Sequence, residues 1–134
     1  MFECLIMGDS TGVGTASAIN ARRTMHCDVI AAERATAKQI LAWRKSTKTY
    51  GTAILAVGSN DIPGPALARD LAKMRSTLAT RRVIWLLPYS RPAAGVVNSV
   101  AISFNDETLD LARFPSKDRV HPARYEDIAK ALLK

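Results

Sequence analysis

Short apolar runs alternate with segments of helical periodicity along the whole chain, and this alternation restricts the fold more than any other feature. Strands are predicted at five apolar runs: Phe2–Met7, Asp28–Ala32, Thr52–Val57, Arg82–Leu87 and Thr108–Leu111. Helices are predicted at Thr15–Arg22, at Ala35–Lys45, after Gly64-Pro65, at Ala94–Asn105 and from Pro122 onward. Such alternation is typical of a parallel sheet covered on both faces. We therefore predict an α/β fold, a three-layer α/β/α sandwich with a flavodoxin-like parallel five-stranded sheet, in a single domain of residues 1–134.

Two clusters of small polar residues follow the first and third predicted strands. Gly8-Asp9-Ser10 ends the first strand, and Gly58-Ser59-Asn60-Asp61 ends the third. In a flavodoxin-like order these strands are neighbours at the switch point, where ligands bind outside the carboxyl ends of the strands. The two clusters therefore predict one site. The segment from Gly8 to Gly14 lacks the glycine patterns of phosphate-binding loops, so nucleotide binding is not expected.

The chain has two histidines, and only one falls where it could act on Ser10. His26 precedes the second strand, so we expect it at the surface, on the amino-terminal edge of the sheet. His121 follows Asp118 by three residues, on a loop that returns to the carboxyl edge. An aspartate so placed can accept the Nδ1–H of the histidine and leave Nε2 free to take a proton. Taken alone, Asp118 and His121 would more commonly be loop and helix-start residues, but with Ser10 they can form a nucleophile, base and orienting acid.

A nucleophilic serine also needs hydrogen-bond donors for the negative oxygen that develops on the carbonyl. The Ser10 N–H lies at the predicted strand-to-helix turn, where amides commonly point inward. The side chain of Asn60 could add a second donor, although asparagine is also a common turn residue. Each indication is weak alone, but all three clusters follow the strands that would bring them together.

These residues resemble the SGNH (GDSL-like) hydrolases, of which the chain would be a minimal-length member. Gly8-Asp9-Ser10 is similar to the nucleophile block, Gly58-Ser59-Asn60-Asp61 to the Gly-x-Asn-Asp block, and Asp118-Arg119-Val120-His121 to the Asp-x-x-His block. The resemblance spans nearly the whole chain and keeps the order of the blocks. It implies an α/β/α fold and ester hydrolysis through an acyl-enzyme. Ser10 would be the nucleophile, His121 the base and Asp118 the orienting acid, with Asn60 and the Ser10 amide as oxyanion donors.

One block departs from the family pattern. The family usually has a glycine after the second strand, and its N–H is a third oxyanion donor. Here the corresponding stretch, residues 31–36, contains no glycine. The third donor is therefore Ala32 or Glu33, or it is missing, and a missing donor would lower the rate on the order of a hundredfold. The candidate oxyanion and substrate-binding residues are thus Asn60, Ala32, Glu33 and Gly58.

The leading functional prediction is a serine esterase that needs no cofactor. A short chain leaves little room for a lid, so an open site for a small acyl group, such as acetyl on a sugar, is expected. The groove wall is expected at residues 88–92, after the fourth strand. Two alternatives stay open, because fold does not determine function. They are a glycan-binding module that has lost turnover and a glycan-cleaving enzyme that uses the same region.

The charge and composition of the chain indicate which classes of binding partner to expect. The net charge is +7, with a pI near 9.9, which suits an anionic polymer such as a cell-wall glycan. The cations are scattered and form no nucleic-acid motif, so nucleic acid is not expected. No apolar run suggests a membrane span, no signal peptide or clustered metal ligands are evident, and a cytoplasmic location is expected. Cys4 and Cys27 are expected as small core residues, with a disulfide as the lesser alternative.

Overall fold

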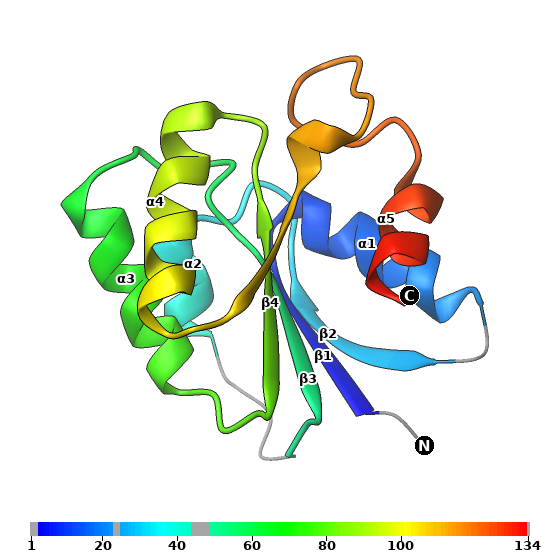
Figure 1. Cartoon of the computed structure of the whole chain (residues 1–134), viewed down its shortest axis with the longest axis horizontal. Coiled ribbons are helices and arrows are strands. Elements are labelled where there is room, and N and C mark those ends of the chain that lie inside the picture. The colour runs from blue at the N-terminus through cyan, green and yellow to red at the C-terminus, as the bar shows by residue number, and fades with distance from the viewer. Residues whose placement is uncertain (1–2, 23–24, 44–48, 134) are drawn as a thin grey trace.

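The computed structural model describes residues 3–22, 25–43 and 49–133, and its centre is a five-stranded parallel sheet (Figure 1). The strand order is β2-β1-β3-β4-β5, which confirms the predicted flavodoxin-like sheet. The strands are β1 Glu3–Gly8, β2 His26–Ala31, β3 Thr52–Ala56, β4 Arg82–Leu87 and β5 Glu107–Asp110. Every position of β3 is buried, as expected for a central strand covered on both faces.

Helices cover both faces of the sheet and make three layers (Figure 1). The helices are α1 Ser10–Asn20, α2 Ala37–Ala42, α3 Pro65–Ser76, α4 Arg91–Ser103 and α5 Tyr125–Leu132, with a short 3-10 helix η1 at Leu111–Arg113. Helices α2, α3 and α4 pack on one face, and α1 and α5 pack on the other. None of the helices in the described ranges is long and apolar enough to cross a membrane.

Alternation along β1 divides the core between these two faces. Leu5 and Met7 belong to the cluster under α2, α3 and α4, whereas Cys4 and Ile6 belong to the cluster under α1 and α5. Successive side chains of a strand point to opposite faces, so each strand supplies both cores. The fold therefore holds β1 from both sides, and the residues that follow its carboxyl end are placed firmly.

Several helix boundaries differ from the predicted ones, and three helix starts differ most. Helix α1 begins at Ser10 rather than at Thr15, because Asp9 caps it and accepts a hydrogen bond from the Thr11 N–H. Helix α4 begins at Arg91, capped by the hydroxyl of Ser90. Helix α5 begins later than Pro122, at Tyr125. The predicted end of the second helix, at residue 45, lies outside the described residues.

The two cysteines form a disulfide, which corrects the expectation of free thiols. Cys4 and Cys27 are buried, as predicted, but they stand directly opposite each other on β1 and β2, with Cα atoms 4.4 Å apart. That separation is within the range a disulfide bridges. A sequence separation of 23 residues does not reveal which strand positions face each other. Disulfides persist mainly in oxidising compartments, so this pair lends no support to the expected cytoplasmic location.

Candidate active site

Ser10 lies at the carboxyl end of β1, on the first residue of α1. The preceding Asp9 is fully buried, and its Oδ1 accepts hydrogen bonds from the Thr11 N–H at 2.9 Å and the Thr11 hydroxyl at 2.6 Å. Burial raises the pKa of Asp9, and the hydrogen bonds from Thr11 oppose that shift. The Asp9 N–H donates to the carbonyl of Ala56 on β3 at 2.9 Å. Cap and backbone together fix where α1 starts and therefore where the Ser10 hydroxyl points.

The glycine before this turn allows β1 and β3 to approach closely. Gly8 is paired with Ala56, and a side chain at position 8 would collide with the carbonyl of Ala56. That same carbonyl accepts the Asp9 N–H. Glycine is therefore required here for a packing reason, and the packing sets the position of the following serine.

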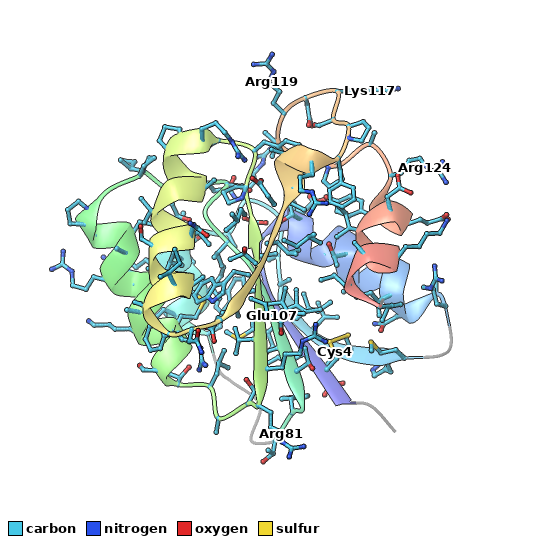
Figure 2. All side chains as sticks on the ribbon, viewed as in Figure 1. Cys4, Arg81, Glu107, Lys117, Arg119 and Arg124 are labelled. Carbon is cyan, nitrogen blue, oxygen red and sulfur yellow. A yellow bond between two sulfur atoms is a disulfide. The ribbon has the colours of Figure 1, made fainter. Side chains whose placement is uncertain are left out.

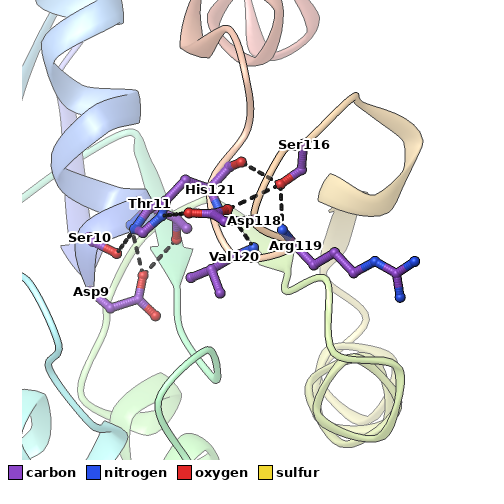
Figure 3. Close-up of polar contacts among 8 residues, drawn as sticks. All are labelled: Asp9, Ser10, Thr11, Ser116, Asp118, Arg119, Val120 and His121. Atoms are coloured by element: carbon purple, nitrogen blue, oxygen red, sulfur yellow. Dashed lines mark hydrogen bonds and ion pairs between the residues drawn. The ribbon is translucent and has the colours of Figure 1, made fainter.

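Ser10, His121 and Asp118 form a continuous hydrogen-bonded chain (Figure 3). The Oγ of Ser10 lies 2.8 Å from Nε2 of His121, across a sequence separation of 111 residues. The Nδ1 of His121 lies 2.8 Å from Oδ2 of Asp118. The structure thus brings together the three residues that the sequence predicted as nucleophile, base and orienting acid. His26, in contrast, is exposed on the amino-terminal edge and pairs with Asp28, as predicted for a surface residue.

A compact loop holds the acid and the histidine. Oδ1 of Asp118 accepts the backbone N–H groups of His121 at 2.8 Å and Val120 at 2.9 Å. The hydroxyl of Ser116 donates to the His121 carbonyl at 2.6 Å and accepts the Arg119 N–H at 2.9 Å (Figure 3). Hydrogen bonds from the His121 side chain and then from the two backbone N–H groups hold the pKa of Asp118 well below its usual range. The acid is therefore ionised and fixed in orientation.

The acid and the histidine are open to solvent. The His121 side chain keeps 43% of its surface exposed, and the Asp118 side chain keeps 55%. A site this open can be reached by a large substrate without any movement of the chain. It does not enclose its substrate.

A cavity of about 320 Å³ adjoins Ser10 and His121. Its other walls are Asn60 from the loop after β3, Glu33 and Arg34 from the loop after β2, and Val120. The segment 88–92, predicted as the groove wall, contributes none of these lining residues. Instead Arg91 lies in α4 and binds Asp110, while Tyr89 donates a hydrogen bond to the carbonyl of Phe114.

The loops after β2 and β3 are tied to each other beside this cavity. The Asn60 side chain donates to the carbonyl of Ala35 at 3.0 Å, and Oδ1 of Asp61 accepts the N–H of Ala37, the first residue of α2, at 2.9 Å. An asparagine amide has two N–H donors, so one remains after the bond to Ala35. The Asn60 side chain therefore has a fixed orientation, and one of its amide N–H groups is left to bind a substrate.

The loop after β2 makes a tight turn whose details correct one prediction. The N–H of Ala32 donates to the carbonyl of Gly8, so it is not available as an oxyanion donor. The Ala35 N–H bonds the Ala32 carbonyl at 3.3 Å, and Arg34 has a φ of 63°. This is the pattern of a type II turn, whose third residue is usually glycine. Arg34 thus occupies the turn position that glycine usually takes.

Two predicted site residues remain, Glu33 and Gly58. One lines the cavity, and the other shapes the turn after β3. Glu33, the other candidate for the third donor, lines the cavity. Gly58 is buried at a φ of 100°, and a side chain there would press against Val97 and Pro88, so this glycine shapes the turn that carries Asn60.

Sequence reasoning missed Arg34, Val120 and Ser116. No local pattern marks them, because their roles depend on a turn and a loop that form only in the folded chain. Within the described ranges no group of three or more histidine, cysteine or carboxylate side chains is placed to hold a metal ion.

Comparisons with known proteins give a fold but no family. No family model matches the sequence, and no curated protein matches it either. Among solved structures, an inhibitor-bound aryl esterase of M. smegmatis is similar, with a TM-score of 0.65 and 13% identity over 98% of this chain and 96% of that one. The psychrotrophic esterase EstA of Pseudoalteromonas sp., inhibited by monoethylphosphonate, has a TM-score of 0.62 and 12% identity over 100% of both chains.

A further similar structure is an acyltransferase. The catalytic domain of the Streptococcus pneumoniae peptidoglycan O-acetyltransferase OatA, with a methylsulfonyl adduct, has a TM-score of 0.60 and 16% identity over 96% of this chain and 87% of that one. At these identities the likeness establishes the shared fold. Proteins that carry this fold thus include enzymes of ester hydrolysis and of acyl transfer.

Proposed function

We propose that this protein hydrolyses a carboxylic ester through an acyl-enzyme on Ser10. The observation that carries the proposal is the unbroken chain from Ser10 Oγ through His121 to Asp118, with both links at 2.8 Å. A serine hydroxyl is a weak nucleophile until a base within hydrogen-bond distance can take its proton. A bare turn serine would not need such a partner.

In the first half-reaction the Ser10 oxygen attacks the acyl carbon, and its proton passes to Nε2 of His121. The tetrahedral intermediate then collapses, the bond to the alcohol breaks, and His121 returns the proton to the leaving alcohol. The ionised Asp118 accepts the Nδ1–H throughout and stabilises the imidazolium that forms. Water repeats the sequence on the acyl-enzyme, which releases the carboxylic acid and restores Ser10.

The negative oxygen of each intermediate needs donors, and three are at hand. The Ser10 N–H has no acceptor within the helix, because it lies in the first turn of α1. The second N–H of the Asn60 amide supplies another donor in the cavity that Ser10 lines. Glu33 and Arg34 also line this cavity, and we place the third donor at one of their backbone N–H groups, which any residue other than proline possesses. The lost glycine therefore does not imply a lost donor, which favours an enzyme over a glycan-binding module.

The proposed substrate is a small acyl group on a larger alcohol, such as an acetylated sugar. The cavity beside Ser10 is only about 320 Å³ and is lined by polar and charged groups as well as Val120, so it offers little apolar wall to a fatty chain. The exposed histidine leaves space for an alcohol that extends into solvent.

A series of p-nitrophenyl esters tests this proposal. We expect kcat/KM to be highest for the acetate and to fall at least about tenfold for the decanoate, because a long chain would desolvate the polar and charged side chains of the cavity without pairing them. The same series on the Ser17→Ala variant is the matched control, because this serine is exposed on α1 and outside the cavity. Equal kcat/KM values across the series would contradict the small-acyl proposal, and no turnover of any ester would contradict the esterase itself.

A further inference from the structure

Two arginines with left-handed backbone flank the cavity beside Ser10. Within the described ranges the non-glycine residues with positive φ are Arg34 at 63°, Asn105 at 58° and Arg119 at 59°. Asparagine adopts this conformation readily, whereas for arginine it costs stability. Arg34 lines the cavity, and Arg119 lies between Asp118 and the cavity residue Val120. Strained residues persist where the surrounding structure or function requires them, so both positions invite a functional explanation.

The pairing of charges separates these cations from the three arginines that bind carboxylates at β5. Arg75, Arg82 and Arg91 each bind a carboxylate on or beside β5, in Asp106, Glu107 and Asp110. Within the same described ranges Arg34, Lys117 and Arg119 have no ion pair. Figure 2 shows Lys117 and Arg119 extending from the ribbon at one end of the molecule, with Arg81 at the opposite end. Three cations that have no ion pair among the described residues thus lie in the cavity wall or in the loop that carries Asp118 and His121.

The acids near the site do not cancel that charge. Asp118 is engaged by the His121 side chain and by two backbone N–H groups. Glu33 lines the same cavity as Arg34, so one carboxylate does oppose one guanidinium there. Arg34, Lys117 and Arg119 set against Glu33 and the ionised Asp118 leave an excess of one positive charge, on a chain whose net charge is +7. A net charge of one sign around a cleft attracts ligands of the opposite sign.

We infer that the alcohol part of the substrate carries an anionic group, a carboxylate or a phosphate, which the Arg34 side chain binds beside the ester. This inference rests on the proposed esterase function and specifies its substrate class. A guanidinium presents paired N–H donors that match both groups. Arg34 binds the anion within the cavity, and Lys117 and Arg119 attract the anionic chain that leads out of it. The matching substrate is an O-acylated anionic glycan.

Two nearly isosteric esters separate charge from shape. They are para-acetoxybenzoate, which carries a carboxylate on its alcohol part, and para-acetoxybenzamide, which is neutral. The readout is the ratio of their kcat/KM values, because the intrinsic reactivity of each ester cancels when variants are compared. We expect Arg34→Gln to lower the acid-to-amide ratio about tenfold, the loss of one charge-assisted contact, and added salt to lower the wild-type ratio. Para-acetoxyphenyl phosphate extends the comparison to a phosphate.

Three further variants complete the experiment. Arg34→Gly accepts the left-handed backbone without strain, so it should fold and should lower the ratio as Arg34→Gln does. Glu33→Gln should raise the ratio, because it removes the opposing carboxylate. Arg81→Gln, at the far end of the molecule, should leave it unchanged (Figure 2). An unchanged ratio in both Arg34 variants, while the amide is hydrolysed, would overturn this inference alone. Failure of wild-type protein to hydrolyse either ester would overturn the proposed function.

Discussion

Replacement of Ser10 or His121 by alanine is expected to lower kcat/KM for p-nitrophenyl acetate by on the order of 10⁴-fold or more. Ser10→Ala removes the atom that bonds to the acyl carbon, and His121→Ala removes the base that lies 2.8 Å from it. Because the two residues act in one step, the double variant should be about as inactive as either single variant. Steady-state hydrolysis followed by p-nitrophenol absorbance measures all three.

The Ser17→Ala variant is the control for the effect of a serine replaced on the same helix. Thermal unfolding and circular dichroism establish that each variant is folded. Ser10 is half-buried and its hydroxyl contacts His121 at the surface of the cavity, so its loss should change stability little. A folded Ser10→Ala protein that retains more than a tenth of the wild-type kcat/KM would contradict the assignment of the nucleophile.

Asp118→Asn is expected to lower kcat about 10⁴-fold while leaving the loop intact. The Asn carbonyl oxygen can still accept the N–H groups of Val120 and His121, which now reach Oδ1 of Asp118. The new NH₂ group would then face Nδ1 of His121. That nitrogen must become an acceptor, so Nε2 carries the proton and cannot take another from Ser10. The residual rate with p-nitrophenyl acetate, compared with Glu107→Gln as an exposed carboxylate on β5, measures the effect.

The lowered pKa of Asp118 determines how the protein responds to acidic pH. Its pKa in the folded protein is held below the ordinary 3.8 by the His121 side chain and the two backbone N–H groups. The stability that these bonds contribute is fully present above the unfolded pKa and is lost only as the pH falls through the lower folded pKa. Protonation of Asp118 therefore does not limit activity under mildly acidic conditions.

An Asp118→Asn protein with activity within tenfold of wild type would contradict the orienting role that we assign to this carboxylate.

The fold was predictable because its periodicities are strong and local. Residues 82–87 formed the predicted strand with the predicted bounds, and the third strand, apolar after Thr52, is buried throughout. The strand order followed from chain length and strict alternation. Helix starts were harder, because they depend on a single side chain. Asp9 moves the start of α1 to Ser10, and Ser90 moves the start of α4 to Arg91.

The triad could be predicted for a topological reason. Ser10 and His121 lie far apart in sequence, but both follow strands, and parallel strands bring their carboxyl ends to one edge. The third donor could not be predicted in this way. Which amide faces the cavity depends on the turn that Ala32 closes with Gly8 and on the left-handed backbone of Arg34.

The disulfide could not be predicted from the sequence for a related reason. Whether Cys4 and Cys27 pair depends on the register of β1 against β2, and a shift of one residue would separate them to opposite faces of the sheet. Strand patterns predict which strands exist but leave the register undetermined.

The central claim is that Ser10 is a nucleophile activated by His121, and covalent labelling with a fluorophosphonate tests it most directly. In that reaction the Ser10 oxygen bonds to phosphorus, fluoride leaves, and His121 takes the hydroxyl proton. We expect intact-mass spectrometry to find one adduct per chain and peptide mapping to place it on Ser10. His121→Ala should abolish it and Ser17→Ala should not. A folded wild-type protein that remains unlabelled, or that is labelled on another residue, would contradict the account.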